Sequence, residues 1–204
     1  KKANYIKKEN EQAAEIYHRA GIYAEFGRII CISTGMTIFR EQHPVFRIIS
    51  FAGDDEKKIL LDFRSFINKL SQGRELYLCA HNGKEFDFPY IARRMLINGV
   101  QLPEMLDIAG KKPWEISHLD TMELWKFGDH KHYTSLELLA EIFNIPSPKT
   151  DIDGTMIAEV YWKDKDLKRI VEYCQRDVIT IAQIMRRYKG EPPVAENIIE
   201  FISV

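Results

Sequence analysis

The sequence predicts an α/β fold with a mixed β-sheet, and three observations lead to this class. Apolar and β-branched residues fill 28–39 and 44–53, and the short link through Pro44 suits antiparallel pairing of two strands. Residues 54–70 then place apolar side chains at helical spacing behind acidic residues, which favour a helix start. Strand-like and helix-like segments alternate after that, and the hairpin-like first connections argue against a uniformly parallel sheet.

The remaining elements can be placed in order from spacing and boundary residues. They are a short amphipathic helix over 9–20, a buried strand over 75–80, a helix over about 87–98, a strand over 115–120, a helix over 154–162 and a long helix over about 165–188. A capping pattern of Thr134 and Glu137 predicts a further helix at LLAEIF, and Asp153 is predicted to cap the helix after it. We expect three parts: an N-terminal segment over 1–27, a core domain over 28–190 and a C-terminal tail over 191–204.

Composition limits the classes of function. Hydrophobic residues at 45% and charged residues at 29% are typical of globular proteins, and no apolar run approaches the roughly 20 residues of a bilayer span, so we expect a soluble protein. The formal net charge of −1 lacks the basic excess of many nucleic-acid binders. Binding to a polyanion would therefore depend on local basic patches, for which the candidates are Arg93/Arg94, Lys111/Lys112 and Arg186/Arg187.

Cysteine and histidine usage argues against a structural zinc site. Cys31, Cys79 and Cys174 lie in apolar settings without a C-x-x-C pair, which predicts buried thiols in a reducing compartment such as the cytoplasm. The histidines lack ligand-like pairing and are interpreted as structural; they are His81, His118, His130 and His132.

One candidate site residue is Asp87 in the stretch AHNGKEFDFPYI, where an apolar strand is predicted to end and a helix to begin. The side chain either caps that helix, a common role for aspartate, or carries chemistry. A second candidate is Asp177 at the edge of the apolar stripe of the last helix, with Tyr173 one turn earlier on the same face. Asp177 either forms a salt bridge or binds a cation.

Taken together, the two aspartates suit a hard divalent cation. Carboxylates from separate elements are typical ligands of Mg²⁺ or Mn²⁺, and two such ions about 3.5–4 Å apart suit phosphoryl chemistry. Two carboxylates are too few for a tight pair of ions, so another acidic residue is required. Asp120 is predicted to cap a helix or to lie at the rim of the site, while Asp151 and Asp153 are interpreted as turn and cap residues rather than ligands.

These residues carry a family resemblance. The block from Asn82 through Phe86 to Asp87 resembles the second motif of the DEDD 3′-5′ exonucleases, Asn-x(2–3)-Phe/Tyr-Asp, and the block from Tyr173 to Asp177 resembles their third motif in its tyrosine form, Tyr-x(3)-Asp. The likeness extends over about 21–190 and is nearest to predicted exonucleases related to the proofreading domain of family B DNA polymerases.

The resemblance implies a fold and a set of roles. The fold would be ribonuclease-H-like, with helices on a mixed β-sheet. Asp87 and Asp177 would bind two Mg²⁺ or Mn²⁺ ions, and Tyr173 would orient the attacking water. Asn82 and Phe86 would shape the site around the 3′ end of single-stranded DNA or RNA.

The sequence departs from the family pattern at its start. The first motif, Asp-x-Glu on the first strand, should precede 28–34, but none of the upstream glutamates has an aspartate two residues before it. We therefore expect the chain to lack its first strand and to be inactive or impaired. Since it begins with Lys1 instead of methionine, it is either a fragment or a catalytically dead relative. The alternative function is a non-catalytic module for nucleic-acid binding or protein interaction.

Overall fold

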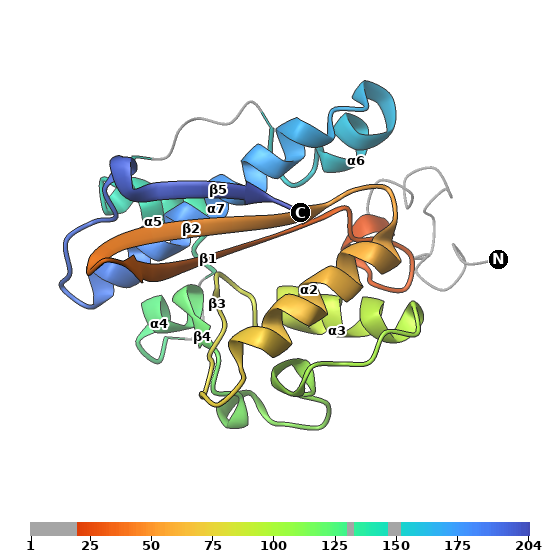
Figure 1. The fold of residues 1–204 in the computed structure, drawn as a ribbon, viewed down its shortest axis with the longest axis horizontal. Coiled ribbons are helices and arrows are strands. Elements are labelled where there is room, and N and C mark those ends of the chain that lie inside the picture. The colour runs from red at the N-terminus through yellow and green to blue at the C-terminus, as the bar shows by residue number, and fades with distance from the viewer. Residues whose placement is uncertain (1–19, 130–132, 147–151) are drawn as a thin grey trace.

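The computed structural model describes residues 20–129, 133–146 and 152–204 and confirms an α/β fold with a mixed sheet (Figure 1). The main sheet has the order β1-β2-β5, formed by β1 (Cys31–Arg40), β2 (His43–Ala52) and β5 (Ile199–Ser203). A second sheet consists of β3 (Cys79–Ala80) and β4 (Leu119–Asp120), which pair in parallel. β1 lies on the side of the main sheet that faces β3 (Figure 1).

The predicted antiparallel hairpin is confirmed. β1 and β2 pair along their full length, with Ile32 opposite Phe51, and the connection at Glu41 and Gln42 adopts positive φ angles of 48° and 70°. β5 pairs in parallel with the other edge of β2, where Ile199 lies opposite Phe46. The predicted C-terminal tail therefore contributes a strand to the sheet.

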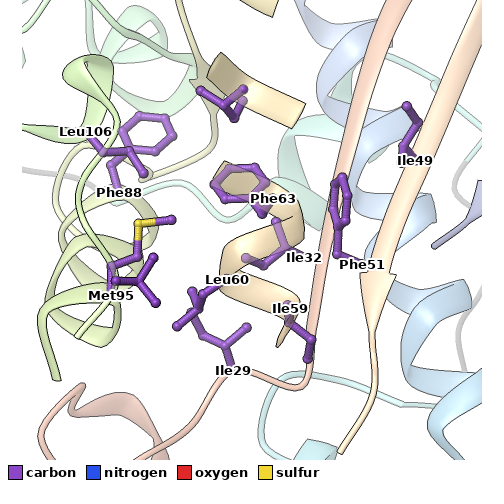
Figure 2. Close-up of a cluster of buried hydrophobic side chains, with 12 residues drawn as sticks. Ile29, Ile32, Ile49, Phe51, Ile59, Leu60, Phe63, Phe88, Met95 and Leu106 are labelled. Atoms are coloured by element: carbon purple, nitrogen blue, oxygen red, sulfur yellow. The ribbon is translucent and has the colours of Figure 1, made fainter. Parts of the chain in front are cut away.

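Alternation along the strands gives the main sheet two apolar faces. On one face, β-strand side chains pack against α2 (Glu56–Leu70) and α3 (Asp87–Ile97) in a core drawn in Figure 2. On the other face, Phe46 and Ile48 pack near α7 (Leu167–Tyr188). α7 approaches closely at Gly35, where an added Cβ would lie 2.6 Å from Val178 Cγ1. Helices thus cover the sheet on both faces.

Shorter elements connect these layers. They are α4 (Thr121–Lys126), α5 (Leu136–Ile142), α6 (Ile157–Glu159), a π-helical turn (Val160–Asp164) and 3-10 turns at Ala20–Ile22, Glu104–Leu106, Pro113–Glu115 and Glu196–Ile198. The predicted strands over 75–80 and 115–120 are wrong in extent, because only the last two residues of each form a ladder. The predicted helix over 9–20 lies outside the described residues except for Ala20, as do His130, His132 and Asp151.

Two predicted helix caps are wrong. Ser135, rather than Thr134, caps α5 by accepting from the Leu138 backbone N–H at 3.2 Å. Asp153 accepts from the Thr155 backbone N–H instead of capping α6, which begins after Met156. At α5 the adjacent Ser135 accepts the capping hydrogen bond, and at Asp153 a local turn uses the carboxylate before the helix begins.

A buried ion pair ties α2, α3 and the segment before β1 together. The Arg94 Nε donates to Glu56 Oε1 at 2.8 Å, and the Arg94 Nη1 donates to the Ala24 carbonyl at 2.8 Å. Glu56 also accepts from the Ile29 backbone N–H at 2.7 Å and from Asn98. Arg94 is only 8% exposed, so its predicted place in a basic surface patch is wrong.

Of the four histidines interpreted as structural, His81 and His118 lie in the described residues, and both form hydrogen bonds within the fold. His81 bonds to Thr121 and to the Thr134 carbonyl, and His118 bonds to the Met105 carbonyl. The prediction of buried thiols is wrong for Cys79, which is exposed. Among the helices of the described segments, none has both the length and the apolar character needed to cross a membrane.

Candidate active site

A groove of about 870 Å³ separates the two sheets and contains the candidate site. We call it the central groove. One wall is the β1 segment 31–37, and the opposite wall is the segment 76–81 that includes β3. Residues of α2, α3 and α7 complete the lining, and these include Asp87, Tyr173 and Asp177. The structure therefore brings the three predicted catalytic residues into one cavity.

The turn between β3 and α3 positions Asp87. Asn82 adopts a left-handed φ of 60°, and Gly83 follows where an added Cβ would lie 2.4 Å from the Ala80 Cβ. α3 begins at Asp87 itself, its N-cap position is Phe86, and no side chain caps it. The interpretation of Asp87 as the N-cap is therefore wrong, and its carboxylate faces the groove instead.

Asp120 holds this turn in place. It caps α4, as predicted, by accepting from the backbone N–H groups of Met122 and Glu123. Its carboxylate also accepts from the backbone N–H of Asn82 at 2.9 Å and of Lys84 at 3.1 Å. The end of β4 is thereby tied to the turn that precedes Asp87, a role that the sequence did not indicate.

Tyr173 and Asp177 lie one turn apart on α7, and the Tyr173 hydroxyl donates a hydrogen bond to the Asp177 carboxylate. In the described part of the chain no lysine or arginine forms an ion pair with Asp177, so the salt-bridge interpretation is not supported. The Asp177 carboxylate therefore lines the groove with a hydrogen bond from the Tyr173 hydroxyl.

The groove makes both carboxylates harder to ionise. Desolvation raises the pKa of Asp87 to about 6, and the charge of Asp120 adds to the shift, although the side chain remains accessible to water in the open groove. Desolvation also raises the pKa of Asp177 to about 6, against the effect of the Tyr173 hydrogen bond, and the charge of Asp87 raises it further. The two carboxylates thus repel each other across the groove, which a cation would relieve.

This repulsion leads to a prediction for stability. Asp177→Asn should raise the melting temperature at about pH 8 by about 2–4 °C, or about 1 kcal/mol after allowing for screening by groove water. Ionised Asp177 destabilises the fold fully above its folded pKa of about 6, and this penalty disappears as the pH falls below its ordinary value of 3.8. The gain should therefore vanish at about pH 4 in thermal melts of both proteins.

Asp62→Asn is the matched control, because Asp62 pairs with Lys58 on the outer surface of α2. It should show no gain at about pH 8. Unfolding of Asp177→Asn at neutral pH would instead assign Asp177 a structural role.

The two predicted substrate-binding residues lie on different sides of the same turn. Phe86 lines the central groove, is 43% exposed and packs against Tyr90 with ring centroids 5.5 Å apart. Asn82 instead lines a second cavity of about 760 Å³, the side pocket, and its Oδ1 is buried without a hydrogen-bond partner. The side pocket is also lined by Lys84, Arg93, Lys111, Trp114, Asp120 and Lys126.

The donors in the groove fit a hard divalent cation in kind but not in number. Asp87 and Asp177 supply carboxylate oxygens, the ligand type that Mg²⁺ and Mn²⁺ prefer. Across residues 20–129, 133–146 and 152–204, no three His, Cys, Asp or Glu side chains are grouped as a metal site. Within the described residues, Asp87 and Asp177 therefore belong to no group of three potential ligands.

Comparison with known proteins identifies the family of the chain. A search of the curated proteins found no match. A family model described as a predicted 3′-5′ exonuclease related to the exonuclease domain of PolB matches residues 22–189, which include the turn at Asn82 and the α7 pair. The chain therefore belongs to this family of predicted 3′-5′ exonucleases related to the PolB exonuclease domain.

Proposed function

We propose that the protein is a metal-dependent 3′-5′ exonuclease that removes nucleotides from the 3′ end of single-stranded DNA or RNA. The observation that carries the proposal is the convergence of Asp87 and Asp177, from separate elements, in one groove beside Tyr173. Membership of the exonuclease family supports a hydrolase that acts on nucleic acid.

The side chains of the groove have distinct roles in this proposal. Asp87 and Asp177 would hold Mg²⁺ or Mn²⁺, which when bound supplies an activated water and neutralises charge on the leaving oxygen. Burial and the neighbouring Asp177 raise the pKa of Tyr173, so its hydroxyl stays protonated at neutral pH. Tyr173 therefore acts as a hydrogen-bond donor that orients water and does not act as a base.

The nucleic acid would lie along the turn between the two cavities. The exposed Phe86 ring offers a stacking surface for the terminal base. Upstream nucleotides would reach the side pocket, where Trp114 is 76% exposed and Arg93, Lys111 and Lys126 offer positive charge to phosphates. These local charges compensate for the near-neutral charge of the whole chain.

A complete site needs carboxylates beyond those in the described residues. The family resemblance implies an Asp-x-Glu motif on a first strand of a ribonuclease-H-like sheet, and these 204 residues contain no such pair before β1. We therefore expect these 204 residues alone to be inactive or impaired, and a longer form with this motif to be active.

The test is a nuclease assay on 5′-labelled single-stranded DNA and RNA with Mg²⁺ or Mn²⁺. In the longer form, Asp87→Asn and Asp177→Asn should each lower the rate by about 100-fold or more, since each removes a metal ligand. Asp62→Asn is the control and should retain the rate. An inactive longer form would contradict the proposal. Equal rates in Asp87→Asn, Asp177→Asn and Asp62→Asn would also contradict it.

A non-catalytic binding module is the second candidate, because the described residues group no three potential metal ligands. It predicts tight binding of single-stranded nucleic acid that is insensitive to chelation of divalent metal. Fluorescence anisotropy with and without a chelator separates the two candidates.

A further inference from the structure

We propose that Cys31 of β1 and Cys174 of α7 form a modification site, in which a peroxide oxidises the two thiols to one disulfide beside Tyr173 and Asp177. The disulfide itself does not depend on the proposed nuclease function. Only its expected effect on nuclease activity rests on that function.

The first argument is that the two thiols are in contact. The Cys174 thiol donates a hydrogen bond to the Cys31 sulfur, and both cysteines are free. Both side chains line the central groove, and both pack against a buried cluster that includes Tyr161 and Ile170. A disulfide has an S–S distance of about 2.05 Å, so two thiols in contact need only a small further approach to form one.

The second argument is that the packing of α7 on β1 supports this contact. Cys31 and Gly35 point to the same face of β1, because side chains alternate along a strand. Cys174 and Val178 lie one turn apart on the same face of α7. At Gly35 an added Cβ would lie 2.6 Å from Val178 Cγ1, so the missing side chain lets the helix approach the strand closely. This close approach brings Cys174 within reach of Cys31.

The third argument is that the two thiols differ in reactivity. The hydrogen bond from Cys174 lowers the pKa of Cys31 against the effect of burial, and a hydrogen bond from Ser33 lowers it further. The same contact and burial raise the pKa of Cys174. The thiolate is the form that attacks an oxidant. Cys31 is therefore the thiol that reacts first, and Cys174 is the partner that converts the product to a disulfide.

The chemistry balances with hydrogen peroxide as the oxidant. The Cys31 thiolate attacks one peroxide oxygen, the O–O bond breaks, and the departing hydroxide takes up the proton that the thiol had released. Cys31 is then a sulfenic acid. The Cys174 sulfur attacks the Cys31 sulfur, the S–O bond breaks, and the hydroxide leaves with the Cys174 proton as a second water. Two thiols thus lose two electrons and two protons, and one peroxide is reduced to two waters. Reversible disulfides of this kind act as redox sensors in reducing compartments.

The disulfide would act on the candidate site through α7. Tyr173 directly precedes Cys174, and Asp177 lies about one turn after it, so a shift of the helix toward β1 displaces both site residues. A misplacement of about 1 Å can cost about 100-fold in rate. In the longer form, peroxide should therefore lower the nuclease rate by at least about tenfold, and dithiothreitol should restore it.

Mass spectrometry tests the disulfide in the 204-residue chain. After treatment with hydrogen peroxide, alkylation of the remaining thiols and digestion with trypsin, the three cysteines lie on separate peptides, 29–40, 75–84 and 170–176. We expect a link between 29–40 and 170–176, in at least about tenfold higher yield than any link to 75–84. Dithiothreitol should remove it. Alkylation of both thiols after the treatment, or an equal yield of links to 75–84, would overturn the proposal.

Serine variants separate the roles of the thiols. Cys79→Ser is the matched control and should keep the link, because Cys79 lies on the opposite wall of the central groove. In Cys174→Ser the reaction should stop at the Cys31 sulfenic acid, which dimedone traps. Circular dichroism should show that both variants remain folded. Equal dimedone labelling of Cys31 in Cys174→Ser and in the unmodified protein would contradict the role given to Cys174.

Further measurements separate another ligand and the proposed function. Zn²⁺ that protects both thiols from alkylation and prevents the link would assign the pair to a soft metal ion and overturn the proposal. A link that forms in a protein without nuclease activity would confirm the modification site while the nuclease proposal fails. In an active longer form, Cys31→Ser should keep its rate in peroxide. Equal inhibition of Cys31→Ser and of the unmodified protein would contradict control of the site by this disulfide.

Discussion

Arg94→Met is expected to lower the free energy of unfolding by about 3–5 kcal/mol, because it leaves the buried Glu56 carboxylate without its cation. Equilibrium unfolding in urea measures the change. The matched control is Arg93→Met, because Arg93 precedes Arg94 in α3 but is exposed, and its replacement should cost at most about 0.5 kcal/mol. Equal losses in the two variants would contradict the role given to the buried pair.

The loss should depend on pH. Burial alone would raise the pKa of Glu56, but hydrogen bonds from Arg94, Ile29 and Asn98 lower it below its ordinary value of 4.5. The ionised carboxylate therefore stabilises the fold fully above that value, and this contribution is lost as the pH falls through the lower folded pKa. The difference between Arg94→Met and the unmodified protein should shrink in strongly acidic solution.

Asp120→Ala is expected to cost about 3 kcal/mol or more, because four backbone N–H groups lose their acceptor and three of these bonds go to one oxygen, Oδ1. Asp120→Asn keeps that oxygen and should lose clearly less. Urea unfolding compares the two, with the exposed Asp107→Ala as control. A loss in Asp120→Ala no larger than in the control would contradict the bridging role.

The same change should affect the candidate site. Without Asp120 the turn at Asn82 loses two of its anchors, and the start of α3 that carries Asp87 is free to shift. In the longer form, Asp120→Ala should therefore reduce nuclease activity more than Asp120→Asn does. Activity that is unchanged in both would show that the turn holds its position by other contacts.

Local periodicity predicted the long elements well. The hairpin, α2, α3 and α7 follow from the spacing of apolar residues and from boundary residues such as Asn98 and Gly99, since these signals act within a few residues. The predicted strands over 75–80 and 115–120 are longer than β3 and β4. An apolar run indicates burial but not how many of its residues pair with another strand. Ser135 replaced Thr134 as the cap because adjacent hydroxyls suit the position equally.

The sequence identifies the candidate residues of the site but not the contacts that hold the surrounding segments in place. Motif spacing identified Asp87, Tyr173 and Asp177, and the fold brings them to one groove. The double role of Asp120 depends on bonds between residues 36 and 38 positions apart, which no local pattern displays. The burial of Arg94 likewise depends on Glu56 from another helix.

The parallel pairing of β5 with β2 has a consequence for folding during synthesis. Phe46 and Ile199 are neighbours in the sheet but are separated by about 150 residues of chain. At roughly 5–20 residues per second, the ribosome needs about eight to thirty seconds to make that interval. Throughout this time β2 has an open edge, so the nascent chain is exposed to chaperones and to mispairing until β5 emerges.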